Sequence, residues 1–397
     1  MTRPRPSLLQ RPPCGPALVL AVVCALSGGG AHATSARLAA LGGGAYLEDD
    51  ANVLRWYGSV VDYPDALVLD LGHFTLPEGW HDTAGARVSG PALGAHVQPD
   101  SAGVWGVIAA YWHERGDDTD PGSLARDRLG ATGTLVWGRR FGAVQPALLV
   151  RASRREDVNP YNRLGTRTEF GAGLRWDVAD GAYLDLAGET RRHEETVTEG
   201  PGVDTAGGDG LGLRARAFLR VGEHTALVPL LDWIAADRPV AAPAADLARS
   251  VRGQRLQVGA GLNWYPDPDH VMVVSAEHAH THVDLRGAAW DDAPAGIAGR
   301  RRDTWALAAG FESRFRHWLM FRGSFRYADV SEVSADGAFR DDWARFTVNL
   351  GAAVQLGPAD LDLAICDREP RPLAGDTDPA LAVDPSTWLG LTLRWRY

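Results

Sequence analysis

The feature that most constrains this 397-residue chain is a two-residue alternation of apolar and polar side chains, recurring from about Leu67 to the end. Successive side chains of a β-strand point to opposite faces, so this period predicts strands with one apolar and one polar face. The fourteen clearest segments are 103–113, 128–138, 143–153, 165–178, 182–195, 210–221, 224–235, 251–265, 270–283, 302–315, 318–330, 341–356, 359–367 and 386–397. The sequence therefore predicts an all-β protein.

The connections between these segments alternate between short and long. Tight connections are expected at 98–102, 139–142, 179–181, 222–223, 266–269, 316–317 and 357–358. Long connections are expected at 114–127, 154–164, 196–209, 236–250, 284–301, 331–340 and 368–385. An antiparallel up-and-down transmembrane barrel, with short turns at one end and long loops at the other, has this parity. Two weaker candidates, 66–74 and 88–97, precede the fourteen segments and keep the number even, so 14 and 16 strands both stay open.

The last strand carries an apolar stripe that ends on an aromatic residue. Its apolar face consists of Leu389, Leu391, Leu393, Trp395 and Tyr397. This ending resembles the C-terminal signature of bacterial outer-membrane β-barrels. The resemblance implies location in the bacterial outer membrane, contact with its lipid, and recognition of the strand ending at Tyr397 by the barrel assembly machinery. A soluble propeller would show one sequence repeat per blade, and the chain has none.

The first 65 residues divide into two parts. Residues 1–33 read as a secretory signal peptide, with a basic start, a short apolar core and the small-x-small site Ala31-His32-Ala33. Residues 34–65 are expected to form a plug or periplasmic segment, and residues 66–397 the barrel. After cleavage, Cys366 is the one remaining cysteine, which excludes an internal disulfide.

The polar faces of the strands carry many arginines, which supply all 40 basic residues of the chain. Because the apolar face of such a strand meets lipid, the polar face lines the lumen. The expected lumen-lining residues are Arg214, Arg216, Glu312, Arg314, Arg322, Arg326 and Arg345. Arginines in a pore wall favour anions, so we expect a channel or transporter for small polar, anionic solutes. The alternative is that the same arginines pair with Glu312, Asp362 and loop acids and fill a closed barrel that serves as a surface scaffold.

The stretch before the strands offers a second functional alternative. An Ala- and Gly-rich run, 36–46, is followed by the acidic stretch Leu47-Glu48-Asp49-Asp50-Ala51-Asn52. This resembles the opening of the long-chain fatty-acid outer-membrane transporter family. The resemblance implies a plug inside a fourteen-stranded barrel and transport of hydrophobic molecules. The chain departs from the family after Asn52, where Val53-Leu54-Arg55 replaces an Asn-Pro-Ala-Gly-like turn, and inward arginines do not suit an apolar pocket.

One cluster has the residue types of a metal site. His278, His280 and His282 alternate along one strand and are followed by Asp284, so the four side chains share a face near the outer mouth. The competing interpretation is a polar lumen or girdle position, because further ligands at metal spacing are absent from the sequence. No Gly-x-Ser-x-Gly elbow is present, so we expect neither an enzyme nor a cofactor. The net charge of −10 argues against nucleic acid as a partner.

Overall fold

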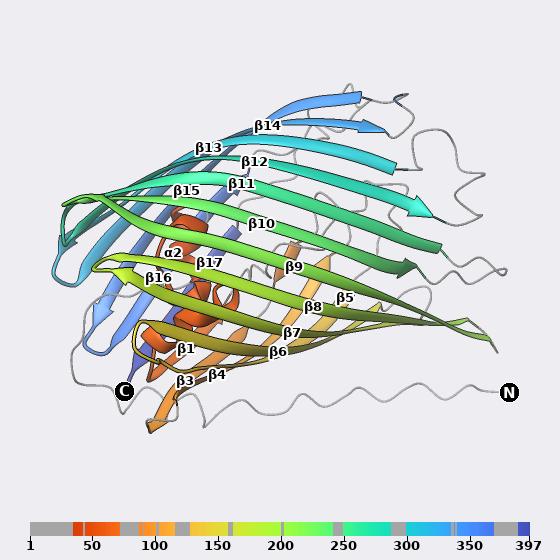
Figure 1. Cartoon of the computed structure of the whole chain (residues 1–397), viewed down its shortest axis with the longest axis horizontal. Helices are drawn as coiled ribbons and strands as arrows, with labels where there is room; N and C mark the ends of the chain where they lie inside the picture. Colours follow the sequence, from red (N-terminus) through yellow and green to blue (C-terminus); the bar gives the residue numbers. More distant parts are fainter. Residues whose placement is uncertain are drawn as a thin grey trace, which may run out of the picture.

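The computed structural model describes residues 35–42, 44–71, 87–89, 91–100, 103–115, 128–157, 162–199, 202–240, 249–286, 299–334, 337, 340–368 and 388–397. The predicted signal peptide, including its cleavage site, lies outside these residues, as do most of the long loops. In the described part the chain forms one closed antiparallel sheet, seen in Figure 1 as a barrel of tilted strands. No helix among the described residues is long and apolar enough to cross a membrane.

The barrel has sixteen strands along its circumference, which settles the open count in favour of the larger number. The strands are β1 (Ala66–Leu71), β3 (Ala92–Asp100), β4 (Gly103–Arg115), β5 (Arg128–Gly138), β6 (Val144–Asp157), β7 (Asn162–Ala179), β8 (Ala182–Glu199), β9 (Gly202–Gly222), β10 (Thr225–Val240), β11 (Arg249–Asp267), β12 (His270–Arg286), β13 (Gly299–Arg316), β14 (Leu319–Ser334), β15 (Arg340–Leu356), β16 (Ala359–Arg368) and β17 (Trp388–Arg396). The short β2 (Arg87–Ser89) pairs with β4 beyond the end of β3 and extends the line of β3.

Closure of the barrel depends on the first and last strands. β1 pairs with β17 along its whole length, from Ala66 opposite Arg396 to Leu71 opposite Leu391, and with β3 on its other side. Beyond the last strand, the Tyr397 amide donates to the Asp65 carbonyl at 3.3 Å, and the Tyr397 hydroxyl donates to the His96 carbonyl at 2.9 Å. The terminal aromatic thus fastens the seam, leaving no open sheet edge there.

The tight turns lie where the sequence places them, and three of them contain a glycine with positive φ. Gly142, Gly181 and Gly357 adopt φ values of 60°, 70° and 66°, in the left-handed region where a Cβ is unfavourable. One predicted long connection is wrong. Residues 196–209 are mostly strand, because β8 continues to Glu199 and β9 starts at Gly202, with these two residues opposite each other. Strand pairing there extends past the segment that shows apolar alternation.

The two faces of the barrel differ sharply in chemistry. Large apolar side chains on alternate positions are exposed on the outside; Trp305 and Phe315 are 63% and 64% exposed. Their register neighbours on the same face include Leu307, Phe311, Phe325, Tyr327, Phe346 and Leu350, all exposed. An outward apolar band on a closed barrel is how β-strands meet lipid, since every backbone group is paired within the sheet. The predicted transmembrane barrel and its outer-membrane location are confirmed on this ground.

The N-terminal segment, residues 35–42 and 44–63, supplies the helical part of the fold. It comprises α2 (Ser35–Ala40) and three short 3-10 helices, η1 (Gly44–Tyr46), η2 (Asp50–Leu54) and η3 (Tyr57–Asp62). In Figure 1 it is the red-orange coil among the strands. α2 contacts β14 to β17, η1 contacts β10 and β11, and η3 contacts β4 to β8. The segment therefore meets the wall on all sides of the barrel.

Apolar packing joins this segment to the inner wall. Val53, Trp56, Tyr57 and Val60 have no exposed surface and form the centre of the main buried cluster. The strands contribute the inward residues Val104, Val136, Leu149, Phe218, Val228 and Leu230. Fully burying one such side chain stabilises by about 1.5–3 kcal/mol, so the cluster is a substantial core.

Candidate functional site in the barrel lumen

Glycines of the inner wall provide the space that the N-terminal segment occupies. A Cβ built on Gly173 would lie 2.9 Å from Tyr57 Cβ, and one on Gly261 would lie 2.8 Å from Tyr46 Cβ. A Cβ on Gly351 would lie 2.6 Å from Ala40 Cβ. Because real Cβ atoms do not approach other atoms so closely, side chains at these wall positions would displace the segment.

Two arginines of the wall hold the segment by its acidic stretch. Arg175 donates all five of its N–H groups, to Glu48 at 2.7 and 3.0 Å, to Asp185 at 2.8 Å twice, and to Asp62 at 2.8 Å. Arg216 donates to Asp185 at 2.9 Å and to Glu48 at 3.1 Å. Its remaining bonds go to the carbonyls of Ala45 and Leu47, at 3.0 and 2.9 Å.

These contacts fix the charge of Glu48. Burial acts to raise the pKa of its carboxyl, but Arg175 and Arg216 outweigh burial and hold that pKa below its ordinary value. The hydroxyls of Tyr63 and Tyr183 also donate to this carboxylate, Tyr63 at 3.0 Å. Glu48 is thus an anion bound by the wall, and it connects the segment to β7, β8 and β9.

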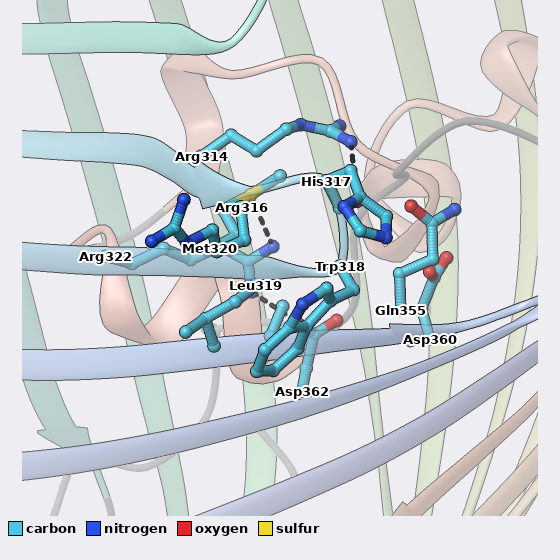
Figure 2. Close-up of a pocket in the computed structure, with 11 residues that line it drawn as sticks. Arg314, Arg316, His317, Trp318, Leu319, Met320, Arg322, Gln355, Asp360 and Asp362 are labelled. Atoms are coloured by element: carbon cyan, nitrogen blue, oxygen red, sulfur yellow. Dashed lines mark hydrogen bonds and ion pairs between the residues drawn. The ribbon is translucent and has the colours of Figure 1, made fainter.

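A second group of ion pairs holds the start of the segment. Arg37 donates to Glu312 at 2.7 and 2.9 Å and to Asp49 at 3.2 Å. Arg322 bridges Glu312 and Asp362 from the next strand along the wall. Figure 2 shows Arg322 and Asp362 among the residues that line a small pocket beside the β13–β14 turn. That pocket has a volume of about 20 Å³, enough for one water but not for a solute.

The remaining arginines expected in the lumen also have partners. Arg214 donates to Glu189 at 2.9 and 3.0 Å and to Asp232 at 3.3 Å. Arg326 pairs with Glu277 on the wall, and Arg314 pairs with Asp269 of a tight turn at 2.9 Å. Arg345 is half-buried on β15. The structure therefore brings Arg214, Arg216, Arg314, Arg322 and Arg326 together with carboxylates, and Arg214, Arg216 and Arg322 are at most 4% exposed.

The three histidines lie on the outside of the barrel. His278 stacks on the exposed Trp305, with ring centroids 4.3 Å apart, and the two residues are opposite each other in the register. His280 contacts Asp303 at 2.8 Å, and His282 contacts Asp284 at 2.8 Å. In the described part of the chain, no group of three or more His, Cys, Asp or Glu residues is placed to hold a metal ion. The histidines therefore occupy a girdle-like position, each beside an aspartate.

Sequence reasoning missed another cluster on the inner wall, formed by Arg151, Arg167 and Arg191 around Glu169. Arg151 and Arg167 donate to Glu169 at 3.1 and 2.6 Å. Arg191 lies 3.6 Å from the same carboxylate and donates to Glu189. The signal was present, because all four occupy inward positions of the same two-residue alternation that identified the other arginines.

Comparison with known proteins gives the fold and no family. No protein-family model matches the chain, and no curated protein matches it. Among solved structures, CdiB from Escherichia coli has a TM-score of 0.50 and 8% identity, covering 84% of this chain and 63% of that one. The toluene transporter TbuX from Ralstonia pickettii has a TM-score of 0.45 and 11% identity, covering 92% and 99%. The siderophore receptor PirA from Acinetobacter baumannii has a TM-score of 0.42 and 7% identity, covering 77% and 62%.

These likenesses bear on architecture alone. This chain spans less than two thirds of PirA and of CdiB, at 62% and 63% of their lengths. The resemblance to the fatty-acid transporter family stays a prediction, and the fourteen strands that it implied are wrong, since the barrel has sixteen. The likeness to CdiB from Escherichia coli, at 8% identity, therefore agrees with the β-barrel architecture and identifies no family.

Proposed function

We propose that this protein is an outer-membrane transporter for small anionic solutes, in which the N-terminal segment is a plug that must move before a solute passes. The observation that carries the proposal is the set of contacts between this segment and the inner wall. Buried ion pairs, close packing on wall glycines and an apolar cluster hold it against strands on all sides of the lumen. A channel open at rest would have no use for such a segment.

Anionic solutes are favoured by the wall itself. Arginine is the only side chain on this wall that carries a permanent positive charge, because the chain has no lysine. Most of these arginines are neutralised by carboxylates, so the wall does not form a uniformly positive pore. Selectivity in this proposal comes from arginines that exceed their partners in number, and those belong to the cluster around Glu169.

The proposal is tested by replacing one wall glycine under the plug with valine, whose side chain should displace the plug. Gly173→Val places side-chain atoms where Tyr57 lies, whereas Gly133→Val adds them on the outer face, where a Cβ would meet nothing within 4 Å. We expect planar bilayers to show little conductance for the wild type and for Gly133→Val. Gly173→Val should give stable steps with an anion-selective reversal potential.

Three other outcomes contradict the proposal in different ways. Steps with cation selectivity would remove the anionic substrate class. Closed barrels that bind laurate in detergent would favour transport of hydrophobic molecules. A folded Gly173→Val barrel with neither conductance nor laurate binding would leave the scaffold interpretation. The absence of enzymatic activity and recognition of the C-terminal strand by the assembly machinery stay predictions.

A further inference from the structure

The Glu169 cluster, defined as Arg151, Arg167 and Arg191 with Glu169, lies on three adjacent strands. Arg151 of β6 is opposite Glu169 of β7, which is opposite Arg191 of β8. Arg167 is two residues before Glu169 on the same face. Arg151 and Arg191 are 5% and 4% exposed, whereas the side chain of Arg167 is 23% exposed and forms the open edge of the cluster.

The cluster has more hydrogen-bond donors than the protein uses. Arg151 Nη2, Arg167 Nε, Arg191 Nε and Arg191 Nη1 are buried and have no hydrogen-bond partner among the described residues. Within that part of the chain, Arg191 makes a single hydrogen bond, to Glu189, and Arg167 makes a single one, to Glu169. A buried donor without an acceptor is costly, so four on neighbouring side chains require an explanation.

The charges around the cluster are also unbalanced, with more arginines than carboxylates. Glu189 is shared by Arg191 and Arg214, and Arg214 shares Asp232 with Arg55 of the N-terminal segment. Leaving Arg55 aside, four arginines of the described wall, Arg151, Arg167, Arg191 and Arg214, meet three carboxylates, Glu169, Glu189 and Asp232, so positive charges outnumber negative ones by at least one. Excess charge and unused donors on the same side chains are the complement of an anion with several acceptor oxygens.

We propose that the Glu169 cluster binds a small oxyanion, a carboxylate or a phosphate, that enters from the lumen. Guanidinium groups match these anions because their N–H groups form a planar fork. Arg167, at the open edge, would make the first contact, and Arg151 and Arg191 would supply the inner donors. The site deepens the proposed function and rests on it for its role, since it names the substrate class of the transporter.

The test is equilibrium binding to the refolded mature chain in detergent, measured by titration calorimetry with inorganic phosphate and with succinate. Arg167→Gln removes one guanidinium that makes a single hydrogen bond, so the barrel keeps its other contacts. Arg192→Gln is the matched control, because Arg192 is the neighbour of Arg191 on the outer face, and its side chain is 73% exposed. We expect Arg167→Gln to weaken binding by about tenfold or more and Arg192→Gln to leave it unchanged.

Arg167→Lys separates charge from geometry, since lysine keeps the charge and loses the fork; it should bind with intermediate affinity. Binding by neither probe, or equal binding by the wild type and Arg167→Gln, would overturn the site. A heat-dependent shift in gel mobility checks that each variant is folded. Failure of the site and failure of the function are told apart by anion uptake into vesicles containing Gly173→Val. Uptake without binding overturns the site alone, and binding without uptake supports the site and overturns the transport function.

Discussion

Two groups of arginines face the same lumen from neighbouring strands, and they differ in how much of their hydrogen-bonding capacity the protein uses. Near the tight turns, Arg175 donates all five N–H groups and Arg216 makes four hydrogen bonds. In the Glu169 cluster, Arg191 is 4% exposed and so about as deeply buried, but it makes one hydrogen bond to the described residues. Arg191 matches Arg175 and Arg216 in residue type and burial, so neither property by itself identifies a binding site.

The two groups differ in saturation, meaning the share of an arginine's N–H donors that have an acceptor within the protein. The carboxylates that bind Arg175 and Arg216 include Glu48 of the N-terminal segment, so these arginines act on the protein itself and hold that segment in place. No segment of the described chain takes that role for Arg151, Arg167 and Arg191, whose unused donors remain on the wall. A saturated arginine is structural, and an unsaturated buried one indicates a ligand.

The largest expected effect comes from substituting a saturated arginine. Arg175→Gln leaves Arg216 as the one arginine that pairs with Glu48 and Asp185 in the described structure, and removal of one partner from a buried ion network costs about 3–5 kcal/mol. Arg191→Gln should cost about 1.5–3 kcal/mol, because it removes one charged hydrogen bond. The two variants are compared by their free energies of unfolding in urea, measured for barrels refolded into vesicles.

Arg192→Gln on the outer face provides the baseline and should stay within about 0.5 kcal/mol of the wild type. An Arg191→Gln variant that loses as much stability as Arg175→Gln would erase the distinction between the two groups.

A smaller effect, with the opposite sign, is expected for Glu169→Gln. The change removes the negative charge that three arginines share, so their guanidinium groups become available to an added anion. Affinity for phosphate or succinate should rise by about tenfold, which corresponds to roughly 1.4 kcal/mol. A cluster with a purely structural role would lose stability without gaining affinity, so calorimetry and thermal unfolding of this variant decide between the two interpretations.

The smallest effect concerns pH and belongs to the plug. The pKa of Glu48 in the folded protein is below its ordinary value of 4.5, so its stabilising contribution is fully present above about pH 4.5 and is lost as pH falls through the folded pKa. Burial raises the pKa of Asp62, more than Arg175 lowers it, so protonation of Asp62 on acidification does not weaken the folded state.

Bilayer conductance followed from pH 7 down to pH 3.5 should therefore stay low until the range below pH 4.5 and then increase. Glu48→Gln should remove this dependence. A conductance increase centred near pH 6 would assign the effect to other groups.

Most of the barrel could be predicted from sequence because lipid and lumen impose opposite requirements on alternate residues. A charge on the lipid face costs roughly 2–4 kcal/mol near the middle of the bilayer, which keeps the alternation regular there. Beyond the bilayer both faces of a strand are polar, so the pattern ends before the strand does. The extension of β8 to Glu199 and of β9 from Gly202 was missed for that reason.

The candidate site was less accessible to the same reasoning. Alternation assigns Arg191 and Arg216 to the same face, but it does not show that one is saturated and the other is not. Saturation depends on which carboxylates lie opposite, and Glu48 comes from a segment without strand periodicity. The contacts of Tyr46 and Tyr57 with wall glycines are equally invisible, since they join residues that are more than a hundred positions apart.

Glu189 receives the Tyr57 hydroxyl from the N-terminal segment, two bonds from Arg214 and one from Arg191. One carboxylate of the wall therefore contacts both the plug, through Tyr57, and the Glu169 cluster, through Arg191. A bound anion that favours the displaced plug must, by thermodynamic linkage, also bind more tightly once the plug is displaced. The two effects are the same factor, one on the plug equilibrium and one on the anion affinity. A solute that draws Arg191 away from Glu189 would act as its own gating signal.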